Sequence, residues 1–425
     1  MAVSNGVTQP ELARRLGVTD AVVIGLGSMV GAGVFAVFAP AARAAGAGLL
    51  VGLVLAAVVA YCNATSSAQL AAQYPTSGGT YIYGRERLGP WWGYLAGWGF
   101  VIGKIASCAA MALTFAAYAV PPAWERPAAA AAVVALAAVN YRGVARTAGS
   151  TRILVAIVLA ALATMVAASL AGGAADPTRL TSWALSESSW YGIFQSAGLL
   201  FFAFAGYARI ATMGEEVRDP HRTIPRAIPL ALSFATVIYT AVGVSALGVL
   251  GPGMLAGSSS PLVAAVQASG WGWAAPVIRL GATAASLGAL LALVAGVSRT
   301  VLAMARHHDL PGWLAAVHPR FRVPHHADVA VAAAICGLVL TVDLRGAIGF
   351  SSFSVLLYYF VANIAAVTQP AHARRYPRGI QVLGAAGCLA LVATLPFTAV
   401  LAGLAVFTTG IVYRAARLAH TNRPR

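Results

Sequence analysis

Four glycines interrupt an uncharged, apolar stretch near the amino terminus. Gly25, Gly27, Gly31 and Gly33 lie within residues 21–42, which are numerous enough to cross a bilayer as one helix. Glycine inside a helix costs about 1 kcal/mol relative to alanine, and backbone that leaves the helix at membrane depth must line a cavity or be buried in protein. The freed N–H and C=O groups could bind a small molecule, or the small residues could serve only close helix packing.

A second candidate break lies at Gly206, within the sequence FFAFAGYARIA of residues 201–211. If the chain contains two inverted repeats of five helices, the first and sixth spans occupy equivalent positions. Interrupted helices at equivalent positions are the usual sequence sign of a midplane binding site in a secondary transporter. The pair of interruptions therefore favours a transporter over packing alone.

One lysine stands among 27 arginines, and it lies in the predicted third span. Lys104 is surrounded by the apolar sequence GWGFVIGKIASCAA, and ionisable residues inside a membrane usually face a cavity, a partner or a proton path. Burial favours the neutral form of an amine, which arginine cannot adopt. We expect Lys104 to face the unwound part of the first helix, where it serves proton coupling or holds that backbone; a structural role is the alternative.

The composition indicates an integral membrane protein, because 59% of the 425 residues are hydrophobic and 9% are charged. Twelve membrane helices are predicted, at about 21–42, 46–72, 89–120, 127–141, 152–172, 189–213, 227–250, 272–304, 327–342, 347–368, 379–395 and 397–413. Basic residues gather in alternate connections, which predicts that both termini are cytoplasmic and argues against a nucleic-acid partner. We expect a cytoplasmic segment 1–19, one membrane domain 20–414 and a cytoplasmic tail 415–425.

Three separated segments resemble signatures of the amino acid–polyamine–organocation (APC) superfamily, in particular its bacterial amino acid permeases. They are GSMVGAGVF (27–35), EEVRDPHRTIPRAI (215–228) and SRTVLAMARHHDLPGWLAAVHPRFRVP (298–324). The resemblance implies an all-α, LeuT-like fold with inverted repeats at about 20–172 and 189–368. Two further helices at 379–413, discontinuous helices 1 and 6, and alternating access are implied with it.

The resemblance also implies a substrate site at the two interruptions. An α-carboxylate would meet N–H groups near Ala32 and Gly33, at the positive end of a half-helix, and an α-amino group would meet carbonyls released in both helices. Aromatic neighbours would contact the substrate side chain or only pack. The implied substrate-binding residues are Ser28, Met29, Gly31, Ala32, Gly33, Phe202, Ala203, Phe204, Ala205 and Tyr207.

Coupling and gating residues depart from the family pattern. Many members carry a glutamate two residues after the glycine of helix 6, where this chain has Ala208 followed by Arg209. Arg209 is interpreted as a gate residue or as a base that reaches toward water, and Glu215 and Glu216 as an ion-pair cluster or as a coupling site. Some relatives bind sodium through two adjacent hydroxyls in helix 8; here the sequence is alanine followed by Ser286, which favours proton coupling or exchange.

The expected function is secondary active transport of neutral L-amino acids in the cell membrane, without a cofactor or a bound metal. Lys104 and Arg209 make the cavity positive, which disfavours cationic substrates. The alternatives are a cationic amino acid or polyamine transporter of the same fold and a membrane interaction subunit without transport. An enzyme is not expected, because the predicted spans contain neither histidine nor a central acidic residue.

Overall fold

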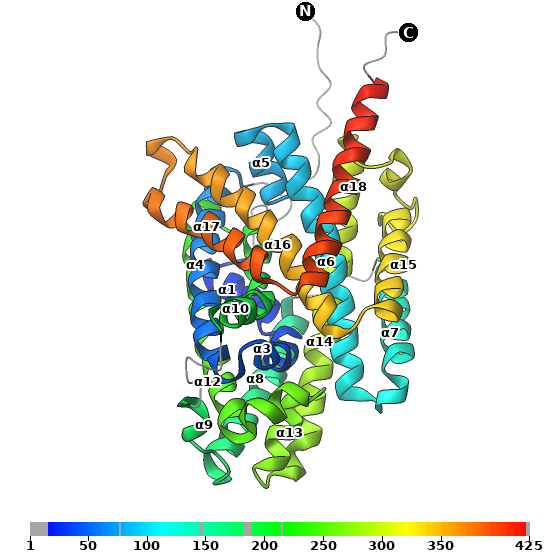
Figure 1. The fold of residues 1–425 in the computed structure, drawn as a ribbon. Coiled ribbons are helices and arrows are strands. Elements are labelled where there is room, and N and C mark those ends of the chain that lie inside the picture. The colour runs from blue at the N-terminus through cyan, green and yellow to red at the C-terminus, as the bar shows by residue number, and fades with distance from the viewer. Residues whose placement is uncertain (1–15, 76–77, 144–147, 182–188, 214–215, 422–425) are drawn as a thin grey trace, which may run out of the picture.

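The computed structural model describes residues 16–75, 78–143, 148–181, 189–213 and 216–421. The regular secondary structure of these ranges is helical, joined by turns and loops, apart from one isolated bridge between Leu16 and Val217 (Figure 1). The predicted terminal segment up to residue 15, with Arg14 and Arg15, and also Glu215 lie outside the described residues.

Helices occupy all twelve predicted places in the described chain. They are α1 (Val18–Met29) with α2 (Gly33–Ala36) and α3 (Phe38–Ala45), α4 (Leu49–Gln73), α6 (Pro90–Ala119), α7 (Glu125–Tyr141), α8 (Ala148–Ala171), α10 (Trp190–Phe204) with η3 (Ala205–Tyr207) and α11 (Ala208–Ala211), α12 (Pro220–Gly257), α14 (Ala275–Arg306), α15 (His325–Thr341), α16 (Leu344–Val367), α17 (Arg378–Thr394) and α18 (Phe397–Thr421). Nine segments of the described residues are long and apolar enough to cross a membrane. The shorter α7, α15 and α17 have 17 residues each, the lower limit for a span.

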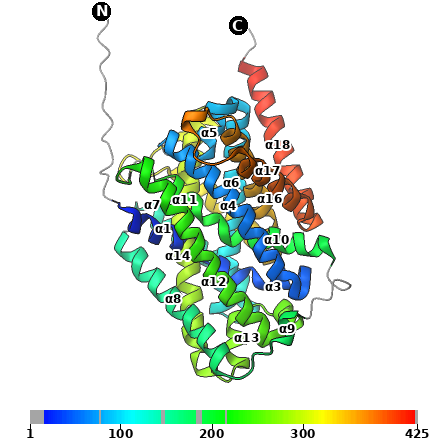
Figure 2. The same cartoon turned by 90° about the vertical axis from the view of Figure 1, so that its left-hand side faces the viewer.

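The first and sixth membrane helices are both discontinuous, as predicted. The first is interrupted between Met29 and Gly33, and the sixth passes through the 3-10 turn Ala205–Tyr207. Figure 2 shows α4 and α12 side by side along one flank of the bundle, and in Figure 1 the pair α7 and α15 and the long α18 stand at its edge. The predicted fold class, a multi-pass α-helical membrane protein of the APC type, is confirmed.

Short helices lie in three connections that the sequence analysis described only as links. They are α5 (Thr80–Leu88), α9 (Thr178–Thr181) and α13 (Pro261–Ala268). In α5, Tyr81 and Tyr83 are almost fully buried, so this connection packs against the bundle. Hydropathy did not reveal α5 because its charged residues lower the average over the segment.

Two membrane helices are longer than their uncharged runs. The helix α12 begins at Pro220, seven residues before the predicted start, and α18 continues to Thr421 instead of ending near residue 413. The first turns of α12 carry charged side chains that stay exposed. In α18, by contrast, Arg414, the last residue of the predicted membrane domain, is buried, and the helix continues into the segment predicted as the tail.

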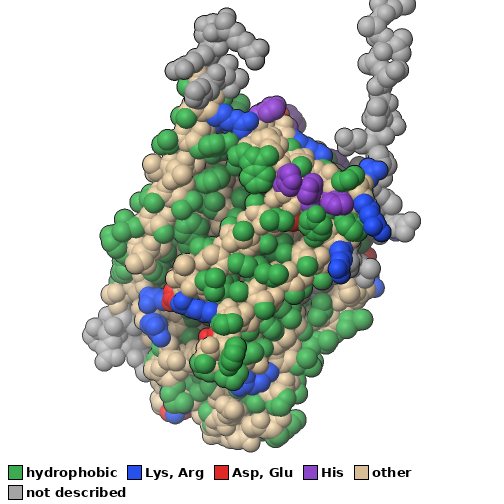
Figure 3. Space-filling view, turned by 90° about the vertical axis from the view of Figure 1, so that its right-hand side faces the viewer, with side chains coloured by type: hydrophobic (Ala, Val, Ile, Leu, Met, Phe, Trp, Pro, Cys, Tyr) green, Lys and Arg blue, Asp and Glu red, His purple; other side chains and the backbone are tan. Residues whose placement is uncertain are grey.

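The surface between the helix ends is mostly apolar. Figure 3 shows one lateral face on which hydrophobic side chains predominate and histidines gather toward the end at which α18 finishes. Large apolar side chains are exposed on several membrane helices, including Val54, Val237 and Leu280. Such a surface is suited to lipid, because a soluble protein rarely exposes apolar patches of this extent.

A buried ion pair fastens α18 to the bundle. The Asp309 carboxylate, 6% exposed, accepts hydrogen bonds from Arg414 and from the Tyr81 hydroxyl at 2.8 Å. The Arg414 guanidinium also lies 5.0 Å and 4.5 Å from the ring centres of Trp91 and Tyr94. Burial and the neighbouring Asp309 carboxylate raise the pKa of Tyr81, so its phenol keeps the proton that it donates.

Replacing Asp309→Asn should destabilise the protein, because Arg414 would remain buried without its counter-charge. Loss of one partner of a buried pair typically costs about 3–5 kcal/mol, so the melting temperature in detergent should fall by several degrees. The control is Asp219→Asn, since Asp219 and Arg222 form an exposed pair at 3.7 Å that contributes at most about 1 kcal/mol. Equal melting temperatures for the two variants would contradict this assignment.

Candidate substrate-binding site

The interruption of the first helix releases backbone groups in a buried region. The helix α1 ends at Met29 and α2 begins at Gly33, and both Met29 and Ala32 are 1% exposed. Within the described part of the chain, no backbone carbonyl accepts a bond from the N–H of Ala32 or Gly33. Donors for an anion are therefore present at the place predicted for the substrate carboxylate.

The interruption of the sixth helix lies directly against that of the first. A Cβ atom on Gly206 would be 2.3 Å from the Ser28 carbonyl oxygen and 2.6 Å from the Met29 nitrogen. A Cβ atom on Gly33 would likewise be 2.8 Å from the Cα atom of Ala203. Real Cβ atoms do not come this close to backbone, so the two breaks meet only because glycine stands at these positions.

The other glycines of the first helix also permit close contact. A Cβ atom on Gly25 would clash with Ile210, one on Gly27 would lie 2.7 Å from Val155, and one on Gly31 would lie 3.1 Å from Ala289. These contacts involve three different neighbouring helices. Close packing, which the sequence analysis weighed as an alternative to a cavity, is therefore a real function of the same glycines.

Two tyrosines bind the carbonyls that the interruptions release, and the sequence analysis missed both. The Tyr239 hydroxyl in α12 lies 2.6 Å from the Met29 oxygen and 2.9 Å from the Ala203 oxygen. The Tyr359 hydroxyl in α16 lies 3.4 Å from the Ala205 oxygen. The one available sequence signal was a tyrosine in the middle of an apolar span, since a buried tyrosine hydroxyl usually finds a polar partner.

The three predicted aromatic residues differ in their surroundings. Phe204 and Tyr207 are fully buried; Phe204 packs edge to face on Tyr239 with ring centres 5.0 Å apart, and Tyr207 lies 5.1 Å from Tyr359. Phe202 keeps 8% of its surface exposed and is the least covered of the three. Packing therefore occupies two of these rings, which leaves Phe202 as the most available to a ligand.

Comparison with known proteins places the chain in a family. A sequence profile for the family described as "Amino acid permease" matches residues 16–421. The chain belongs to the amino acid permease family.

Relatives of this permease include transporters of different substrates. An uncharacterized transporter of Mycobacterium tuberculosis is 58% identical over 98% of this chain and 94% of its own length. A branched-chain amino acid permease of Bacillus subtilis is 26% identical over 84% of this chain and 81% of its own. A chloroplastic cationic amino acid transporter of Arabidopsis thaliana is 27% identical over 85% of this chain and 67% of its own length.

Lys104 of the permease is buried, with 7% of its surface exposed. Its ammonium nitrogen lies 5.9 Å from the ring centre of Phe100, one turn earlier on α6. Tyr118 follows fourteen residues later on the same face of α6, and its hydroxyl donates to the Phe35 carbonyl of α2 at 3.1 Å. Closer to Lys104, the residues one turn away on either side contact α16: the rings of Phe100 and Tyr358 are 5.4 Å apart, and the hydroxyls of Ser107 and Ser351 are 2.7 Å apart. None of the described contacts of Lys104 reaches the interruption, so its predicted position facing the first helix stays a prediction.

Arg209 lies outside the buried part of the site. Its side chain is 45% exposed and pairs with Glu216 at 3.7 Å. Close by, the Leu16 nitrogen donates to the Glu216 oxygen at 3.2 Å and the Arg218 nitrogen donates to the Leu16 oxygen at 2.9 Å. Arg209 and Glu216 thus belong to the cluster where the chain before α1 meets the end of the sixth helix, and both interpretations of Arg209 stay open.

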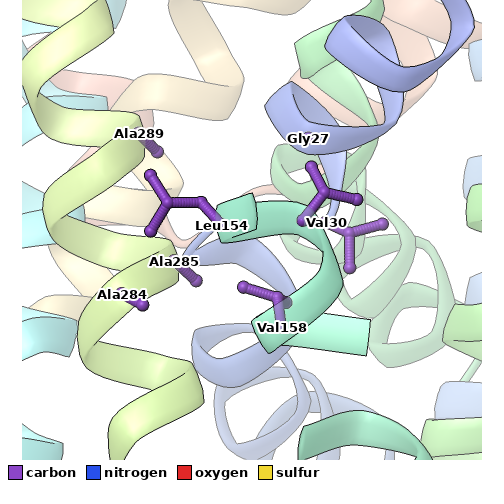
Figure 4. Close-up of a pocket in the computed structure, with 8 residues that line it drawn as sticks. Gly27, Val30, Leu154, Val158, Ala284, Ala285 and Ala289 are labelled. Carbon is purple, nitrogen blue, oxygen red and sulfur yellow. The ribbon is translucent and has the colours of Figure 1, made fainter. Parts of the chain in front are cut away.

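A small cavity lies between the first, fifth and eighth helices, beside the alanine and Ser286 that were compared above with a sodium site. Its volume is about 20 Å³, and Figure 4 shows Gly27 and Val30 facing α8 and α14 across it. It is lined by Gly27, Val30, Leu154, Val155, Val158, Ala284, Ala285 and Ala289. Ser286 is fully buried but does not line the cavity, and its hydroxyl has no hydrogen-bond partner in the described chain. Apolar side chains are poor ligands for a cation that requires several oxygens.

Replacing Gly206→Ala should abolish transport while leaving membrane insertion intact. The added methyl group would lie within 2.6 Å of backbone atoms of Ser28 and Met29, so the two interruptions would have to separate. Gly296→Ala is the matched control, because the space beside Gly296 in α14 is open. Uptake in cells, normalised to the amount of protein in the membrane, measures the effect; normal uptake by the Gly206 variant would contradict the close contact.

Proposed function

We propose that the permease is a secondary active carrier of neutral L-amino acids that works by alternating access. The observation that carries the proposal is that N–H groups of Ala32 and Gly33 without a described carbonyl partner lie at the same interruptions as the carbonyls of Met29, Ala203 and Ala205, which tyrosine hydroxyls approach. The N–H groups suit a carboxylate and the carbonyls suit an ammonium group. Backbone alone thereby recognises the part that all amino acids share.

The distribution of buried acids favours neutral over cationic substrates. Among the described residues, the buried carboxylates are Asp309 and Asp328, which lie beside the ends of α14 and α15 and away from the interruptions. A cationic side chain in the site would meet no carboxylate there, and the positive charge of Lys104 opposes it. The alternative remains a cationic amino acid or polyamine carrier, since one relative is described as a cationic amino acid transporter.

We propose that the carrier either couples transport to protons or exchanges one amino acid for another. The side chains that line the cavity beside Gly27 and Ala285 contain no oxygen, so a sodium ion there would depend on backbone carbonyls, which favours protons or exchange. Lys104 is a buried amine in a membrane span, and an amine, unlike a guanidinium, can give up its proton.

The proposed orientation places both termini in the cytoplasm of a cell whose plasma membrane the chain spans. The excess of arginine in alternate connections supports it. In this arrangement the repeats cover about 20–172 and 189–368, and the last two helices follow them.

Counterflow in proteoliposomes tests the proposed substrate class. Vesicles preloaded with unlabelled L-leucine, L-alanine, L-arginine or putrescine receive the same compound in labelled form, and accumulation of label identifies a carried substrate. We expect leucine or alanine to accumulate and arginine and putrescine not to. Analogues that lack the amino group or carry a methyl ester should compete at least about 100-fold more weakly, because they leave buried polar groups unpaired.

Two outcomes would overturn this proposal. Accumulation of arginine or putrescine without leucine or alanine would establish the cationic alternative. Absence of counterflow for every amino acid, from protein that is folded and inserted, would favour an interaction subunit without transport.

Lys104 is tested by variants that remove its charge or fix it. Lys104→Met is neutral at every pH and Lys104→Arg remains charged, so neither can release and take up a proton. Both should retain exchange but lose the acceleration of uptake by an inward proton gradient, measured with and without that gradient. An unchanged response to the gradient in both variants would assign Lys104 a structural role.

A further inference from the structure

The Tyr239 hydroxyl lies between the two interrupted helices and carries one hydrogen that can be donated to either. It lies within hydrogen-bond distance of the Met29 oxygen of α1 and the Ala203 oxygen of α10, at 2.6 Å and 2.9 Å. The tyrosine is 1% exposed, and its ring is held against Phe204. The hydroxyl is therefore fixed by packing at a point where the two helices meet.

These two oxygens lie where their helices are interrupted. Met29 is the last residue of α1, and Ala203 is the next to last residue of α10, directly before the 3-10 turn Ala205–Tyr207. A buried carbonyl without a donor is costly, most of all inside a membrane. Because a hydroxyl has one hydrogen, Tyr239 can donate to only one of the two oxygens at a time.

An ammonium group supplies three N–H donors and a positive charge, so it satisfies both oxygens at once. The same carbonyls are those proposed above to bind the substrate ammonium. We infer that Tyr239 is a positioning residue that takes the place of the substrate ammonium when the carrier is unloaded, so that the two interrupted helices can close together without substrate. This inference rests on the proposed function and adds to it a role for a residue in α12.

The inference separates two kinds of flux. In exchange, every reorientation of the carrier occurs with an amino acid bound, and the ammonium provides the donors. In net transport, the carrier must also return unloaded. Tyr239 then supplies the donor that lowers the free-energy cost of bringing the two interrupted helices together without substrate. Removing the hydroxyl should therefore slow net transport and spare exchange.

The experiment compares Tyr239→Phe with the wild type in proteoliposomes loaded with labelled L-leucine. Efflux into buffer without amino acid measures net transport, and efflux into buffer with unlabelled L-leucine measures exchange; an ionophore collapses the proton gradient in both. Loss of one hydrogen bond to a buried group corresponds to about a ten-fold change in an equilibrium constant. Net efflux should fall by about ten-fold, while exchange should stay within about two-fold of the wild type.

The matched control is Tyr94→Phe. The Tyr94 hydroxyl is also fully buried and also donates to a backbone carbonyl, that of Gly410 in α18 at 2.7 Å, but it lies far from the interruptions in the chain. This variant should leave the ratio of net efflux to exchange unchanged. A ratio that falls equally in both variants would overturn the inference.

The remaining outcomes are also decisive. An unchanged ratio in Tyr239→Phe, or a wild type that exchanges leucine but shows no net efflux, overturns the inference and leaves the proposed function standing. A wild type without exchange of any amino acid refutes the proposed function itself. If Tyr239→Phe does not survive purification, saturating L-leucine should restore it, since the ammonium replaces the missing donor; loss with and without leucine contradicts the inference.

Discussion

The requirement that backbone polar groups inside a membrane find partners governs the centre of this permease. The first helix is interrupted between Met29 and Gly33, and the α-helical hydrogen bonding of the sixth changes at the 3-10 turn Ala205–Tyr207. The bilayer core contains no water that could bind the polar groups left there. Neighbouring helices supply the missing donors through Tyr239 and Tyr359. Around the same centre, Tyr118 of α6 donates to the Phe35 oxygen and accepts from the Leu262 nitrogen at 3.4 Å. Several membrane helices are thus positioned by tyrosines that donate hydrogen bonds to backbone carbonyls at or near the two interruptions.

Glycine contributes to this centre in two ways that the sequence alone could not separate. Packing and backbone release appeared as alternatives, because a small residue permits both. The structure unites them at Gly33 and Gly206, where the absence of a side chain lets one interruption touch the backbone of the other. Close contact places released carbonyls from both helices near one another, and a small charged group can then reach several of them. Packing is therefore the means by which the binding site is assembled.

Much of the fold followed from local patterns, whereas the site depended on contacts between distant residues. Uncharged runs predicted the twelve helices, and glycines predicted both interruptions, because hydropathy and helix propensity act within a few residues. Tyr239 meets Met29 across 210 residues of chain, and Arg414 meets Asp309 across 105, so neither pairing leaves a local signal. For the same reason the sequence predicted that Lys104 is buried, but not that its nearest described partner is Phe100.

The ion pairs differ in strength between the parts of the bundle, and this difference indicates which parts can move. The pair of Asp309 and Arg414 joins α18 to the end of α14 and is buried, so separating it would leave a charge without a partner. The amino-terminal end of α1 is instead held by Asp20 and the largely exposed Arg152, and α11 by the exposed pair of Arg209 and Glu216. Exposed pairs contribute at most about 1 kcal/mol each, so water can replace them at little cost. Of these ion pairs, those that hold α1 and α11 are thus the cheapest to break, as the proposed alternating access requires.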